Sequence, residues 1–87
     1  MAGKVKSFQL SILSEKEIMY YGECNILFAP AFHGGDVAIL PELTPMIMKM
    51  GEGGVSMAIS GQKTKVCEVK SGVLYVQDNE VIVLVNL

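Results

Sequence analysis

The sequence lacks tryptophan, has one histidine and two cysteines, and carries few charges. Lys and Arg number 7 against 9 Asp and Glu, a formal net charge of −2, with no basic cluster longer than two residues. Nucleic-acid binding and a polybasic lipid-binding segment both need concentrated positive charge, so neither is expected. Cys24 and Cys67 are too few for a disulfide framework, and with His33 they do not complete a conventional closed zinc site. We expect two free thiols in a reducing compartment.

Long apolar runs are also missing. The longest are ILFAPAF at 26–32 and VIVLV at 81–85, far short of the roughly 18–20 residues that span a bilayer. The opening MAGKVKSFQLSIL has neither the apolar core nor the small-residue cleavage site of a signal peptide. We therefore expect a protein that is cytosolic or peripheral to a membrane.

Catalytic motifs are absent as well. The chain has no Gly-x-Ser-x-Gly elbow, phosphate loop or dinucleotide fingerprint. The segment FHGGD places His33 and Asp36 around two glycines, which suits acid–base chemistry if a nucleophile or metal stands nearby. Because the sequence supplies neither, a solvated loop tip is the better interpretation. We expect no enzyme, no cofactor, no metal and no small-molecule substrate.

Apolar residues, by contrast, are plentiful. They make up 51% of the 87 residues, and charged residues only 18%. A single domain of this size buries only about 60–65% of the surface that its unfolded chain exposes. Two explanations fit: strands buried on both faces, or an outer surface that meets a partner.

Short alternating stretches separated by turn residues run along the whole chain. In the first, Phe8, Leu10 and Ile12 fall on one face, the period of a strand. The strand VIVLV has no polar face, so it should be buried on both sides or covered by a partner. The pattern predicts one all-β domain over residues 1–87, a flattened antiparallel β-sandwich or barrel of about ten short strands. The expected strands are 5–13, 18–23, 24–29, 37–40, 46–50, 55–59, 64–69, 73–77 and 81–85.

Lys49 lies between two methionines in MIMKM, a context typical of the modified lysine of biotin-carrying domains, which are small and all-β. A biotin- or lipoyl-type carrier with Lys49 modified is therefore an alternative function. A modified lysine must stand in an exposed hairpin turn, whereas Lys49 follows Pro45 in an apolar run, and the turn GEGG comes after it. The spacing favours a strand with Met46, Met48 and Met50 on one face.

The stretch PAFHGGDVAILPELTP at 30–45 resembles the hallmark segment of the epsilon subunit of F-type ATP synthases, called delta in mitochondria. Residues 35–41 follow the middle of that segment and Pro45 matches its closing proline. The family's glycine and histidine after the first proline are replaced by Glu42 and Leu43. Segments 8–23, 51–59 and 70–85 also resemble the family in the right order.

The resemblance implies a non-catalytic β-sandwich at the foot of the rotating central stalk. One surface would bind the gamma subunit, and the loop end would rest on the membrane c-type ring, coupling proton flow to ATP synthesis. The protein would be peripheral, at the cytoplasmic face of the bacterial inner membrane or the equivalent organelle face. Both sheet faces are apolar in sequence, which leaves the gamma-facing one open. The resemblance places at or near the ring-facing end Phe32, His33, Gly35, Asp36, Glu42 and Leu43.

The family usually continues into two C-terminal helices that inhibit ATP hydrolysis. This sequence stops at Leu87, within or just after the last expected strand. We expect residues 1–87 to contain neither those helices nor the nucleotide-binding residues sometimes found on them, and not to inhibit hydrolysis.

Overall fold

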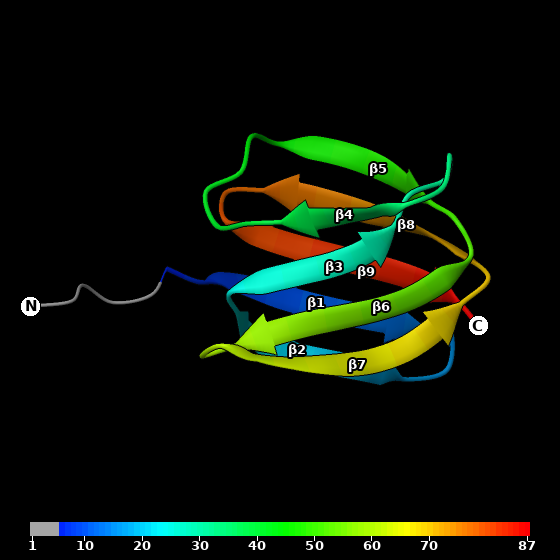
Figure 1. Ribbon diagram of the computed structural model, residues 1–87, viewed down its shortest axis with the longest axis horizontal. Helices are drawn as coiled ribbons and strands as arrows, with labels where there is room; N and C mark the ends of the chain where they lie inside the picture. Colours follow the sequence, from blue (N-terminus) through cyan, green and yellow to red (C-terminus); the bar gives the residue numbers. More distant parts are fainter. Residues whose placement is uncertain (1–5) are drawn as a thin grey trace, which may run out of the picture.

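Nine β-strands form two sheets packed face to face in the computed structural model, which describes residues 6–87 (Figure 1). Alternating apolar residues make each stretch a strand, because one face of the strand is buried and the other meets solvent. The strands are β1 (Phe8–Ser14), β2 (Ile18–Cys24), β3 (Ile26–Pro30), β4 (Asp36–Ile39), β5 (Met46–Met50), β6 (Gly53–Ile59), β7 (Gln62–Val69), β8 (Ser71–Gln77) and β9 (Glu80–Asn86). The all-β sandwich predicted from the sequence is confirmed.

The strand order is β2-β1-β9-β8-β5 in one sheet and β4-β3-β6-β7 in the other. Neighbouring strands are antiparallel, with one exception among the described residues: β1 and β9 are parallel, with Leu10 opposite Val81. Parallel neighbours need a long crossover, and the seven intervening strands supply it. The prediction of a purely antiparallel sandwich misses this pair, because local alternation does not encode which distant strands become neighbours.

The core lies between the sheets and is formed by alternate residues of each strand. A one-residue slip would expose a strand's whole apolar set, and each fully buried aliphatic side chain contributes roughly 1.5–3 kcal/mol, so the register is strongly specified. In β9 the core side is Val81, Val83 and Val85, whereas Ile82 and Leu84 face outward. The fully buried side chains include Phe8, Leu10, Ile12, Leu27, Ile39, Met50, Val55, Leu74, Val81 and Val83.

Two expected strands, 24–29 and 5–13, depart most from the observed ones, and the others agree to within two residues at each end. The stretch 24–29 is not one strand, because Cys24 ends β2 in one sheet and Ile26 begins β3 in the other. Between them the side chain of Asn25 donates to the carbonyl of Lys6 at 2.8 Å and accepts the N–H of Ser60 at 2.7 Å, which holds the sheet change. The first strand, expected over 5–13, begins at Phe8, and Val5 lies outside the described residues.

The connections gather at the two ends of the sandwich (Figure 1). One end, the Phe32 end, consists of the segments 15–17, 31–35, 51–52 and Lys70. The opposite end, the Glu42 end, consists of Asn25 and the segments 40–45, 60–61 and 78–79. Any partner that rests on one end therefore meets only one of these loop sets.

Candidate partner-binding surfaces

The β3–β4 loop projects from the Phe32 end as a tight turn. Gly34 and Gly35 adopt φ values of 99° and 74°, a region that side-chain-bearing residues rarely enter. The N–H of Ala31 donates to the carbonyl of Gly35 at 2.9 Å, and the N–H of Gly34 donates to that of Ala31 at 3.1 Å. The turn leaves Phe32 54% exposed, with His33 and Asp36 also exposed.

Phe32 is held against strand β5 by Lys49. The Lys49 ammonium lies 4.3 Å from the Phe32 ring centroid, and the His33 ring meets that ring edge-on at 5.5 Å. Lys49 itself lies opposite Val73 in the β5–β8 ladder rather than in a hairpin turn. The carrier alternative is therefore not supported, because the lysine of a carrier stands at an exposed tip. Met50 and, less fully, Met46 and Met48 face the core, as the sequence predicts.

Glu42 and Leu43 lie at the Glu42 end, away from the other expected ring-facing residues. The Glu42 carboxylate pairs with Lys6 at 3.0 Å, and its N–H donates to the Asn79 side-chain oxygen at 2.8 Å. Leu43 is half-buried against the core. The structure thus brings Phe32, His33, Gly35 and Asp36 together and separates Glu42 and Leu43 from them, because β4 carries the chain from one end to the other.

The outer face of the five-stranded sheet carries an exposed apolar band. A row of paired residues crosses all five strands: Tyr21, Ser11, Ile82, Tyr75 and Ile47. Ser11 is the polar member of this row and is buried, so β1 contributes to the band through Leu13. Ile47 is 73% exposed and Tyr21 71%. Contiguous exposed apolar surface of this kind marks interaction sites. The apolar band comprises Leu13, Ile18, Tyr21, Ile47, Val73, Tyr75, Ile82 and Leu84.

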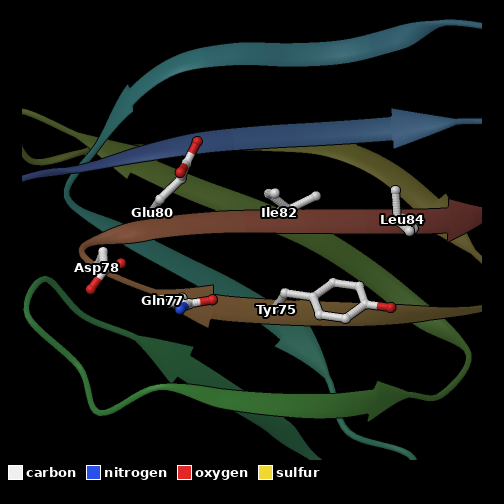
Figure 2. A pocket seen from close by; sticks show the side chains of 6 residues that line it. All are labelled: Tyr75, Gln77, Asp78, Glu80, Ile82 and Leu84. Atoms are coloured by element: carbon white, nitrogen blue, oxygen red, sulfur yellow. The ribbon is translucent and has the colours of Figure 1, made fainter.

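The sequence gives only part of this band. The missing polar face of VIVLV indicates exposed apolar side chains at Ile82 and Leu84. Tyr21 and Ile47 join them only through the strand pairing, which the sequence does not specify. Figure 2 looks onto the band where it forms a shallow depression, with Tyr75, Ile82 and Leu84 on one side and Gln77, Asp78 and Glu80 on the other.

The outer face of the four-stranded sheet is less open. Phe28 is covered by Lys63, whose ammonium lies 4.3 Å from the ring centroid. Around it stand the small residues Ala38 and Ala58, opposite Phe28 and Ile26 in the ladders. This face offers less exposed apolar surface than the apolar band.

Metal-binding chemistry is not assembled in residues 6–87. In this range no three His, Cys, Asp or Glu side chains form a group that could hold a metal ion. Burial raises the pKa of the Cys24 and Cys67 thiols, which disfavours reactive thiolates. No helix in the part that the structure describes is long and apolar enough to cross a membrane.

Comparison with known proteins identifies the family. The sequence model of one protein family, the ATP synthase delta/epsilon chain β-sandwich domain, matches residues 7–87. The chain belongs to this family. Relatives of this delta/epsilon sandwich include the ATP synthase epsilon chains of Nitrosospira multiformis, 33% identical over 79 residues, and Psychrobacter arcticus, 35% identical over 80 residues. These matches cover 91% and 92% of the chain but 56% and 57% of the relatives, so the chain spans little more than half their length.

Solved structures share the delta/epsilon sandwich fold. A chain in the mitochondrial ATP synthase structure of Euglena gracilis superposes with a TM-score of 0.80 at 15% identity, covering 95% of this chain and 53% of that one. A chain in the central stalk and c-ring structure of Tetrahymena thermophila mitochondrial ATP synthase gives 0.75 at 12% identity, covering 98% and 67%. At these identities the likeness establishes the fold alone.

Proposed function

We propose that this chain is a non-catalytic central-stalk subunit of a proton-translocating ATP synthase, linking the gamma subunit to the membrane rotor ring and coupling proton flow to ATP synthesis. One observation carries the proposal: a sandwich of the delta/epsilon family exposes an apolar band across a whole sheet. The names of its relatives and the stalk-and-ring setting of a structural neighbour support it. Torque transfer requires a rigid domain with two binding surfaces and does not require an active site.

The gamma subunit is assigned to the apolar band. The cores of protein–protein interfaces are apolar and enriched in aromatic residues, tyrosine among them. The band supplies Tyr21 and Tyr75 among aliphatic side chains. The alternative, the four-stranded face, has its one aromatic ring, Phe28, covered by Lys63. The difference between the two faces supports the five-stranded sheet as the gamma-binding one, a choice that the sequence leaves open.

The membrane ring is assigned to the Phe32 end. Phe32, His33, Gly35 and Asp36 form an exposed tip that a flat partner can reach. Glu42 and Leu43, which the resemblance includes with them, belong to the opposite end and are left out of the assignment. Residues 1–87 would then act as one domain, peripheral, at the cytoplasmic face of the bacterial inner membrane or the equivalent organelle face.

Reconstitution tests the proposal. The chain is combined with its cognate gamma subunit and membrane ring, and binding and coupled ATP synthesis are measured. Ile47→Asp should abolish gamma binding while leaving ring binding in place, because it puts a charge in the apolar band. The matched control Thr64→Asp changes an exposed residue on β7 of the other sheet and should bind normally. Failure of the unmodified chain to bind gamma would overturn the proposal.

A further inference from the structure

Carboxylates line one long side of the apolar band. One row of cross-strand pairs lies two residues along the strands from the row that runs from Tyr21 to Ile47. In it Glu23 pairs with Gln9, Gln9 with Glu80, and Glu80 with Gln77. Asp78 stands beside it in the β8–β9 turn (Figure 2). All three carboxylate residues are exposed. The band is therefore bounded on this side by negative charge and amide groups.

These carboxylates have no cationic partner within residues 6–87. The ion pairs there are Lys6–Glu42 and Lys65–Glu68. Glu23 accepts a hydrogen bond from the Ser7 hydroxyl at 2.9 Å, which leaves its charge uncompensated. The outward-facing residues on the strands of the five-stranded sheet include one lysine, Lys49. It lies on the far side of the band from Glu80. Along the strands the face is thus polarised, with negative charge on one side and Lys49 on the other. Beyond the Lys49 side, the β1–β2 turn adds the exposed residues Glu15, Lys16 and Glu17.

We propose that this polarity fixes how gamma is oriented on the chain: the gamma surface that covers the apolar band carries Lys or Arg residues where it meets Glu23, Asp78 and Glu80. The inference rests on the proposed function and specifies the chemistry of the partner. Apolar contact alone is non-directional, so a flat band would accept a partner in several orientations. Complementary charge along one side selects a single orientation and speeds encounter.

A second copy of this chain fits the face poorly. In a twofold pair whose axis runs along the strands, the carboxylate sides of the two copies would face each other. With the axis across the strands, the carboxylate side of one copy would lie over the Lys49 side of the other. One lysine would then face three carboxylates, and two charges would remain unpaired on each side. An anionic lipid surface would be repelled by the same carboxylates. A basic protein surface is the occupant that satisfies both the apolar band and its charged side.

The test is titration of the chain with its cognate gamma subunit at 50 and 300 mM NaCl. The double variant Asp78→Asn/Glu80→Gln should weaken binding about 5- to 10-fold at 50 mM and less than about 2-fold at 300 mM, because salt screens exposed charges. Leu84→Ser should weaken binding equally at both salt concentrations. A matched control, Glu52→Gln/Glu68→Gln, neutralises two exposed carboxylates outside the five-stranded sheet and should leave both affinities unchanged.

The outcomes separate the two proposals. If Leu84→Ser weakens binding and the Asp78/Glu80 double variant does not, the charge-orientation proposal is overturned and the proposed function stands. No binding of the unmodified chain to gamma overturns both. Sedimentation of the chain alone as a dimer that Leu84→Ser dissociates would assign the band to a second copy and overturn this inference. Thermal unfolding of each variant confirms that these exposed substitutions leave the fold intact.

Discussion

The ammonium of Lys49 lies 4.3 Å from the centroid of the Phe32 ring, and this contact joins β5 to the tip of the β3–β4 loop. Lys49 borders the apolar band, whereas Phe32 belongs to the end assigned to the ring. The contact therefore links the two proposed partner surfaces at one corner of the sandwich.

Breaking that contact should loosen the tip at little cost to the fold. An exposed cation–π pair contributes about 0.5–1 kcal/mol, so Lys49→Gln and Phe32→Ala should each lower the free energy of unfolding by no more than about 1 kcal/mol. A double-mutant cycle by urea denaturation should give a coupling energy of similar size. The matched control is Lys63→Gln, which uncovers Phe28 on the other sheet. Additive effects of Lys49→Gln and Phe32→Ala on the free energy of unfolding would contradict an energetic coupling between Lys49 and Phe32.

Asn79 should matter more to stability than its exposure suggests. Its side chain accepts from the Glu42 N–H and donates to the carbonyl of Ser7, each at 2.8 Å, and its φ is 58°. Asn79→Ala removes both hydrogen bonds and places an alanine in a left-handed conformation, so it should destabilise by about 1–3 kcal/mol.

The conformational part of that loss can be measured separately. Asn79→Gly also loses the bonds but tolerates the positive φ, so it should be the milder of the two in urea denaturation. Equal unfolding midpoints for the alanine variant and the unmodified chain would show that Asn79 does not hold the Glu42 end together.

The methionines of β5 should differ sharply in their contribution. Met50 is fully buried opposite Gly72, whereas Met46 is only half-buried at the other end of the strand. Met50→Ala leaves a cavity and should lower the free energy of unfolding by about 2–5 kcal/mol. Met46→Ala should cost clearly less, since its neighbours include solvent. Equal losses in thermal unfolding would mean that the methionine stripe is not oriented as described.

Alkaline pH should weaken the fold through Cys24. Burial raises the pKa of its thiol, so the folded state favours the neutral form. That contribution to stability is complete below the unfolded-state pKa of about 8.5 and is lost as pH rises through the higher folded-state value. The urea midpoint should therefore fall as pH rises above about 8.5.

Two single variants assign that pH dependence. Cys24→Ala should flatten the alkaline slope, and Cys67→Ala, at a less buried thiol, should flatten it less. In the folded protein a thiol reagent should label Cys67 before Cys24. A slope unaffected by Cys24→Ala would assign the effect to other groups.

The local alternation of apolar and polar residues predicts most strands, because a half-buried strand has apolar side chains on one face and polar side chains on the other. The prediction fails where distant segments decide the outcome. The parallel pairing of β1 with β9 is one case, and the row from Tyr21 to Ile47 is another, since it depends on the register of five strands.

The candidate site shows the same limit. Positions 32–36 and 42–43 are close in sequence, yet the four residues of β4 carry the chain to the opposite end of the sandwich between them. Their grouping by resemblance joined residues that lie at opposite ends of the sandwich, so a partner resting on one end meets only one of the two sets. The contact of Lys49 with Phe32 also has no signature in the local pattern, because it joins strand β5 of one sheet to the β3–β4 loop of the other.

The parallel β1–β9 pair determines how much of the chain must be synthesised before the five-stranded sheet can form. β9 lies in the middle of its sheet, with β1 and β8 on either side, so a nascent chain that has not yet emerged past Glu80–Asn86 has a gap there and two unpaired edges. The five-stranded sheet can close only after nearly the whole domain has left the ribosome. Folding dominated by such long-range pairing is slow, on the order of milliseconds to seconds, and until β9 is in place the facing edges of β1 and β8 are unpaired and prone to aggregation.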